Sequence, residues 1–398
     1  MRIDREHLTT VLKTVCAPVG ALGGCLLLCF GMYAGASVIA ENRFERAIKE
    51  AETAVAETRA GAFHYNALSA KEQMIYDAIT SAAETYEEQT EILSFVPTGE
   101  EYTRAMQAVL LDNPVLFAIR AEECTLVTST YTAAVEMVYC EVPEARAAQL
   151  SGAVDKITAG IAKTEDKRVI ADALHDALAA VCTYPMEDGA CSASTSTSTA
   201  YDALVTGVAD GYGYALAYQL LCEEMGIECE TVPGTAGGAS HAWNAVTLDG
   251  VVGYTDVMWD DAPAADDADT HIPFHGYSYL SYGDMSCDHI ADNALLWRQD
   301  DTQDYYEYHG LYAANADDTA RLLCDLADRA RAEQGDTLEL CIGEMVSDYV
   351  LEEYLASAIA AANATSYDGD VPRLRSVNRI YHASETRCAL TVRLFFEE

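Results

Sequence analysis

The stretch at residues 207–261, GVADGYGYALAYQLLCEEMGIECETVPGTAGGASHAWNAVTLDGVVGYTDVMWDD, decides the fold of this chain. Its apolar residues first recur at the three- and four-residue spacing of one helix face, which predicts a helix over Gly213–Met225. Gly226 follows at the position of a left-handed cap that ends a helix. The next residues predict a strand over 227–232 and a loose loop over 234–240. The predicted order is therefore helix and strand, followed by a hairpin.

The residues after 240 predict this β-hairpin. Asp249-Gly250 is a typical two-residue hairpin turn, and it joins predicted strands at 241–246 and 251–259. The turn sets the register, so that His241 and Asp256 share one face as diagonal neighbours, roughly 7–8 Å apart at Cα. An imidazole and a carboxylate in these positions can act as the base and its orienting group in a nucleophilic enzyme, because the carboxylate selects the imidazole tautomer.

The same stretch resembles the core of the transglutaminase-like superfamily. The papain-like site of that family places a cysteine at a helix start, a histidine on one strand and an aspartate on the next. The resemblance gives the last two roles to His241 and Asp256, and the run at 257–261 is similar to the family's ending of the site strand. It places the catalytic cysteine at Gly211. It also implies a papain-like α+β core in which a helix packs on an antiparallel sheet.

The residue at the cysteine position decides whether this chain is an enzyme. Gly211 has no side chain that could form an acyl-enzyme, and a register two residues earlier would place Ala209 there, equally without a thiol. Cys222 lies about 16 Å further along the predicted helix and cannot replace the missing cysteine. The serines and threonines of 192–199 form a polar run, which is either a flexible linker or a lid that supplies another nucleophile.

Two aromatic residues are expected to line the cleft. Tyr212 follows Gly211, and Trp243 lies on the same side of the predicted hairpin as His241. Strand alternation directs Trp259 to the opposite face. Packing in the core is the alternative role for either tryptophan.

Outside this stretch the sequence predicts an α+β chain in four parts. Ser69-Ala-Lys-Glu72 has the form of a capping box at a helix start, and the segments 65–79 and 110–119 are similar to a helical lead-in found before the core in transglutaminase-like proteins. Further helices are predicted up to residue 112 and over 144–162 and 167–184, and further strands over 115–119, 338–342 and 390–396. The predicted parts are a tail and transmembrane anchor at 1–44, a helical and α+β lead-in at 45–145, the core at 146–300 and a small α+β domain at 301–398.

The composition excludes some classes of function. The chain has 398 residues, of which 50% are hydrophobic, enough for two or three packed domains. Its net charge is −40, from 64 acidic and 24 basic residues. Nucleic acid is therefore excluded as a partner, because its phosphates would be repelled.

An apolar segment near the N-terminus predicts contact with a membrane. Between Lys13 and Glu41 lie 27 uncharged residues, which is long enough to cross a bilayer of roughly 30 Å. We expect an uncleaved single-pass anchor through residues 15–40 with the bulk of the chain outside the cytoplasm. The alternatives are a signal peptide that is removed on secretion and a buried helix.

The cysteines and histidines suggest neither a metal nor a cofactor. Among 13 cysteines, Cys182–Cys191 and Cys222–Cys229 are close enough in sequence to be disulfides, with buried free thiols as the alternative. His271, His275 and His289 have no partners at ligand spacing and are interpreted as ordinary loop residues.

Two functional hypotheses follow. In the first, the chain is a catalytically degenerate, extracytoplasmic and membrane-anchored protein that binds a protein or peptidoglycan-type ligand through the remnant of the cleft at His241, Asp256 and Gly211. In the second, it is an active thiol-type peptidase or amide-transferring transglutaminase whose nucleophile comes from elsewhere. The presence of a nucleophile near His241 separates the two.

Overall fold

The structure is a computed structural model. It describes residues 56–184, 199–261, 274–292, 302–315 and 337–343, short pieces between and beyond these ranges, and the strands at 374–381 and 388–396. The membrane segment expected at 15–40, and residues 192–198 of the polar run, lie outside the described residues. Within the described part, no helix has both the length and the apolar character that crossing a membrane requires.

The chain forms two compact units, and the four-part division stays a prediction. The first unit consists of residues 1–109 with 120–138, and the second of residues 110–119 with 139–398.

The described part of the first unit contains three helices and a short antiparallel pair of strands. Its described elements are α3 (Phe63–Asn66), α4 (Ala70–Glu84), most of α5 (Gly99–Asp112), β1 (Thr125–Thr128) and β2 (Ala133–Glu136). The predicted capping box at the start of α4 is confirmed, because Ser69 accepts from the Glu72 N–H while the Glu72 side chain accepts from the Ser69 N–H. Ile75 and Ile79 bury the apolar stripe of this helix.

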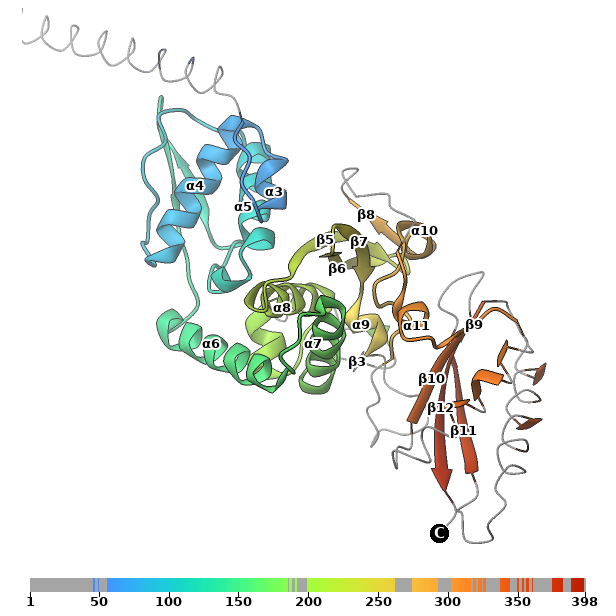
Figure 1. The fold of residues 1–398 in the computed structure, drawn as a ribbon. Helices are drawn as coiled ribbons and strands as arrows, with labels where there is room; N and C mark the ends of the chain where they lie inside the picture. Colours follow the sequence, from blue (N-terminus) through green and yellow to red (C-terminus); the bar gives the residue numbers. More distant parts are fainter. Residues whose placement is uncertain are drawn as a thin grey trace, which may run out of the picture. The chain divides into compact units, whose positions relative to one another are not determined.

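The second unit places a buried helix against a curled antiparallel sheet. Its helices before the sheet are α6 (Pro143–Gly160), α7 (Lys167–Val181) and α8 (Gly211–Glu224), with short turns at Pro114–Leu116 and Asp202–Thr206. The sheet has the order β7-β6-β5-β8, from β5 (Glu228–Ala236), β6 (Ala239–Leu248), β7 (Val251–Thr255) and β8 (His289–Ala291). The helix α8 packs on β5 and β6 (Figure 1) and buries Tyr214, Tyr218 and Leu221 among the residues of α7 and the sheet.

The hairpin between β6 and β7 has the predicted register. Leu248 pairs with Val251 and Asn244 with Thr255. Asp249 and Gly250 both have positive φ, 51° and 83°, which is the backbone that a tight two-residue hairpin turn requires.

Three predictions in this region were wrong. The strand after the turn ends at Thr255 rather than at 259, because Asp256 caps the short helix α9 (Val257–Asp260) through the Trp259 N–H. The predicted loop at 234–240 is a second hairpin, in which β5 and β6 turn at Gly237-Gly238. The predicted strand at 115–119 begins as a 3₁₀ turn, since the fixed φ of Pro114 suits a helix start.

The boundaries of α8 follow from its caps. The helix begins two residues earlier than predicted, because the Asp210 side chain accepts from the N–H groups of Tyr212 and Gly213. Gly226 has φ +73° just beyond the helix end, in agreement with the predicted left-handed cap. Gly211 is therefore the first residue of the helix.

A second sheet lies at the C-terminal end of the same unit. It has the order β11-β12-β10-β9, from β9 (Tyr312–Ala313), β10 (Thr337–Ile342), β11 (Leu374–Tyr381) and β12 (Cys388–Phe396). The strands predicted at 338–342 and 390–396 are confirmed, whereas β11 was not predicted. Smaller described elements are β3 (Met186–Glu187), β4 (Ala190–Cys191), α10 (Tyr282–Met285) and α11 (Tyr305–Tyr308).

Candidate functional site

The predicted histidine and aspartate meet at the end of the hairpin. His241 lies in β6, and Asp256 follows the last residue of β7 as the cap of α9. His241 Nε2 lies 2.5 Å from Asp256 Oδ2, and both residues are buried. Asp256 Oδ1 accepts from the Trp259 N–H at 3.2 Å, so the carboxylate is held on two sides. An oriented imidazole of this kind is half of an acyl-transfer site.

The Nδ1–Cε1 edge of the imidazole lies directly against Gly211. A Cβ atom at position 211 would be 2.1 Å from His241 Nδ1 and 2.3 Å from its Cε1, whereas ordinary contacts begin at 3.4 Å. The ring therefore occupies the space in which the side chain of any other residue at 211 would begin. The structure brings Gly211, His241 and Asp256 together, and a thiol at position 211 would require the His241 ring to shift.

A second histidine joins the pair, and sequence reasoning missed it. His289 in β8 is buried, and its Nε2 lies 2.9 Å from the same Asp256 Oδ2, while its Nδ1 bonds to Asp288. Its interpretation as an ordinary loop residue was wrong. No spacing in the sequence marks it, because β8 reaches the site only by pairing with the far end of β5.

The charges of this network stabilise one another. Burial raises the pKa of Asp256, but the two histidines more than offset it and hold that pKa below its ordinary value. Burial lowers the pKa of His289, but its hydrogen bonds to Asp256 and Asp288 outweigh burial and raise that pKa to about 9. The carboxylate is thus kept ionised between two imidazoles.

Aromatic rings close the network off from solvent. The ring centroids of Trp243 and Trp259 lie 6.4 and 6.2 Å from that of His241, and 4.9 and 4.6 Å from that of His289. The prediction that Trp259 points to the opposite face was wrong, because the chain leaves the strand for α9 before this residue. Trp243 is only 2% exposed, while Tyr212 is partly buried. These rings fill the core of the site region.

The described residues supply no replacement nucleophile. In this part of the chain no serine, threonine or cysteine side chain hydrogen bonds to His241, whose described bond goes to Asp256. Cys222 is fully buried in the middle of α8, as the helix arithmetic requires. Cys182, Cys222 and Cys229 are free thiols, so the predicted disulfide Cys222–Cys229 is not formed, and the side chain of Cys191 lies outside the described residues.

Two groups of side chains have the donor types and spacing of metal ligands. The first is His241, Asp256 and His289, and the second is His175, Asp176 and His275. In each group one donor atom from every residue lies within 4.8 Å of the others. The expectation that no metal cluster exists rested on spacing along the sequence, whereas both groups are assembled by the fold.

Comparisons with known proteins place this site in a family context. A model of the transglutaminase-like superfamily matches residues 155–259, a range that holds Gly211, His241 and Asp256. Among curated proteins, the comparison found no match.

Two solved structures are similar at a low level. A crystal structure of a TGase has 13% identity and a TM-score of 0.25, over 41% of this chain and 48% of that one. The crystal structure of menin, which reveals the binding site for Mixed Lineage Leukemia (MLL) protein, has 14% identity and a TM-score of 0.24, over 57% and 53%. The chain thus spans about half the length of each, and likeness at this level carries no argument about function.

Proposed function

We propose that the transglutaminase-like domain at residues 155–259 is a non-catalytic binding domain. The apolar segment at residues 15–40 would hold it on the outer side of a cell membrane, and its ligand would be a protein or a peptidoglycan-type polymer. The contact between the His241 ring and Gly211 carries the non-catalytic part of this proposal.

Acyl transfer makes demands that this geometry does not meet. A nucleophile must lie within hydrogen-bond reach of the base and about 3–3.5 Å from the carbonyl carbon of the substrate. Nδ1 of His241 instead faces a glycine, and in its present position the ring occupies the space that an attacking atom would need. The base and its aspartate are also buried, so an amide would have to displace packed tryptophan rings to reach them.

The His241–Asp256 pair then has a structural rather than a catalytic role. A hydrogen bond between an imidazole and a buried carboxylate is charge-assisted and stronger than a neutral one. Because the ring already fills position 211, we expect Gly211→Cys alone to give no activity. A transglutaminase-like fold does not by itself imply the chemistry of that family, and we propose that the surface around the closed site makes the contacts with a ligand.

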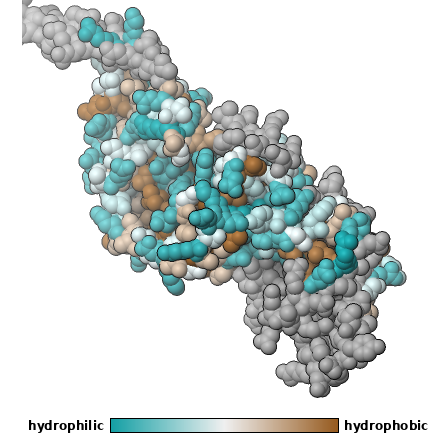
Figure 2. Space-filling view, in the orientation of Figure 1, coloured by the Kyte–Doolittle hydropathy of each residue, from teal (hydrophilic) through white to brown (hydrophobic). Residues whose placement is uncertain are grey.

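The charge distinguishes the two ligand classes. A net charge of −40 repels anionic polymers and attracts surfaces with basic patches. Hydrophilic residues cover most of the described part of the face shown in Figure 2. The composition therefore favours a protein with a basic surface over a peptidoglycan-type polymer.

The catalytic part of the proposal is tested by assays on the purified full-length chain. Amide hydrolysis is measured with fluorogenic peptides, and amide transfer with a glutamine peptide and a primary amine. We expect no turnover above the level of His241→Ala, which controls for contaminating enzymes. Turnover by the unmodified chain that disappears in His241→Ala would overturn the proposal.

The binding part is tested separately. The biotinylated chain is incubated with purified peptidoglycan and with a fraction of cell-surface proteins, at low salt and at about 0.5 M salt, where surface charges are screened. We expect retention of a basic protein that is released by salt. Retention by peptidoglycan alone would reassign the ligand class, and retention by neither fraction would contradict a binding function.

A further inference from the structure

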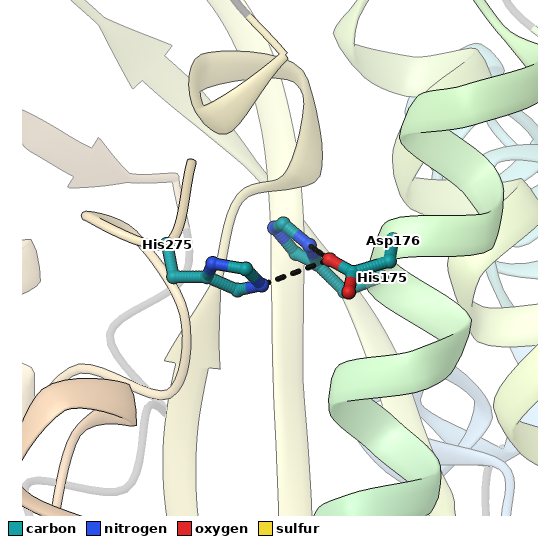
Figure 3. Close-up of side chains that lie close together, drawn as sticks. All are labelled: His175, Asp176 and His275. Carbon is teal, nitrogen blue, oxygen red and sulfur yellow. Dashed lines mark hydrogen bonds and ion pairs between the residues drawn. The ribbon is translucent and has the colours of Figure 1, made fainter. Parts of the chain in front are cut away.

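A second histidine network lies apart from Gly211 and His241, in the same compact unit. His175 and Asp176 come from α7, and His275 from the segment that follows α9 in the chain (Figure 3). His175 Nδ1 lies 3.3 Å and His275 Nε2 2.8 Å from the same atom, Asp176 Oδ1. Both imidazoles are buried, whereas the Asp176 side chain is 46% exposed. Two ring nitrogens from distant segments thus converge on one carboxylate oxygen at the edge of solvent.

The outer nitrogen of each ring has its own carboxylate. His175 Nε2 lies 3.0 Å from Asp260 Oδ2, and His275 Nδ1 lies 2.7 Å from Glu339 Oε2. Both carboxylates are themselves held, Asp260 by the Tyr277 N–H and Glu339 by the His275 N–H. This pattern of carboxylate, histidine and inner donor is the one that orients histidines which bind metals, because the outer bond sets the tautomer and the ring direction.

A count of protons shows what the inner position requires. A neutral imidazole carries one N–H. In the tautomers that suit a metal, the outer carboxylates of Asp260 and Glu339 accept these two N–H groups. The inner nitrogens, Nδ1 of His175 and Nε2 of His275, then direct lone pairs at a carboxylate oxygen, which is also an acceptor. Either two further protons or one divalent cation must lie between them. Burial lowers the pKa of both rings, but their carboxylate partners outweigh it and raise the pKa of His175 to about 9 and that of His275 above its ordinary value. Without an ion, protons therefore fill these contacts, and a divalent cation would displace them and bind all three donors at once.

We propose that His175 Nδ1, His275 Nε2 and the carboxylate of Asp176 bind one divalent transition-metal ion of the Zn²⁺ type. Two ligands of a tetrahedral zinc ion at 2.0–2.1 Å lie about 3.3 Å from each other. The spacing of His175 Nδ1 and Asp176 Oδ1 already has this value, and that of His275 Nε2 and Asp176 Oδ1 is about half an ångström shorter. All three donor atoms lie within 4.8 Å of one another. Imidazole and carboxylate are donors that suit zinc and its neighbours.

The position of this site indicates a structural role with access to solvent. Its ligands join α7 to the segment after α9, and through Glu339 they join both to β10. Three protein ligands leave a position for water, and the exposed side of Asp176 gives the ion an entry path. The ion would therefore tie the core sheet region to the C-terminal sheet.

The other group of donors is a weaker candidate. His241, Asp256 and His289 are all buried, and the second ring nitrogen of His241 faces Gly211 rather than an orienting carboxylate. At that place one of the two histidines would have no outer carboxylate to orient its ring, and the ion would have no open path from solvent.

The test is a metal titration of the full-length chain, purified without a polyhistidine tag or chelators. The protein is incubated with zinc chloride, freed of excess metal, and analysed by elemental mass spectrometry. We expect about one zinc ion per chain, and competition with a coloured chelator gives the affinity. Replacement of zinc by cobalt(II) should give the visible absorption of a tetrahedral site with nitrogen and oxygen ligands.

Four substitutions locate the ion. Asp176→Asn and His275→Gln should each weaken zinc binding by at least about tenfold. His289→Gln, in the other group, and His309→Gln, which removes a histidine bonded to Asp172 in the same unit, should leave it unchanged. Asp176 is partly exposed, so its near-isosteric substitution tests the site even if the histidine variant fails to fold. The proposal is overturned if the unmodified chain binds no zinc, if Asp176→Asn binds as tightly as the unmodified chain, or if His289→Gln abolishes binding.

Discussion

Replacement of Gly211 by alanine tests the central observation about the site. The substitution adds a single methyl group at the first residue of α8, where the backbone does not have the positive φ that favours glycine. The new Cβ would lie 2.1 Å from His241 Nδ1, more than 1 Å inside the ordinary contact range that begins at 3.4 Å. The imidazole must therefore move, and its hydrogen bond to Asp256 must lengthen or break.

Two effects set the size of the loss. Forcing a methyl group into a packed site costs about 1–3 kcal/mol. Loss of a buried hydrogen bond to a charged group costs about 1.5–3 kcal/mol. Because a shift of the ring relieves part of the clash, we expect the free energy of unfolding to fall by roughly 2–5 kcal/mol.

Urea unfolding followed by tryptophan fluorescence measures this change in stability in the second compact unit, which contains Gly211. The chain has three tryptophans, and all of them belong to the second unit, with Trp243 and Trp259 beside His241. Gly152→Ala is the matched control, since Gly152 lies in α6 with nothing near its added methyl group. It should raise the stability by about 0.5–1 kcal/mol.

A double-mutant cycle isolates the contact itself. His241→Ala removes the ring, so the methyl group of Gly211→Ala should then cost little. We expect a coupling free energy of at least about 1 kcal/mol between the two substitutions. If Gly211→Ala is within about 0.5 kcal/mol of the unmodified chain, or if the two effects are additive, the ring does not fill position 211 and the inference of a closed site is wrong.

Three further predictions concern other parts of the chain. The pKa of His289 is raised to about 9, so its charged form stabilises the folded state fully below about pH 6.5. This stabilisation, at most about 3 kcal/mol, should be lost as the pH rises through 9. The free energy of unfolding measured from pH 6 to 10 should depend less on pH in His289→Gln, and an unchanged pH dependence would contradict the assignment. Burial raises the pKa of the Cys182 thiol to about 12. Iodoacetamide at about pH 8 should therefore label the exposed Cys287 and leave Cys182 unmodified until the chain is denatured. Mass spectrometry of the digested peptides measures this difference in labelling. Ser69→Ala should lower the free energy of unfolding by about 1 kcal/mol, because it removes the cap of α4. Ser81→Ala, on the exposed face of the same helix, should change the stability measured by circular dichroism by less than about 0.5 kcal/mol. Equal effects of the two substitutions would rule out the cap.

Local patterns predicted the elements that carry the site. The Asp249-Gly250 turn determines its own register, because a two-residue turn admits few backbone conformations. The capping box at Ser69 and the left-handed Gly226 likewise depend on neighbours within a few residues. The sequence by itself therefore determined the helix, the hairpin and the absence of a thiol at Gly211. The meeting of His241 with an aspartate after the hairpin also followed from short-range rules.

Contacts between distant segments decided the rest. His289 joins Asp256 because β8 pairs with β5. His275 joins α7 through its bond to Asp176, a residue 99 positions earlier in the chain. Neither approach leaves a periodic signal in the sequence, since each depends on how whole elements pack. The position of the His241 ring over Gly211 is also a packing result: a glycine permits the ring to settle there, but only the surrounding helix, sheet and tryptophans make it do so.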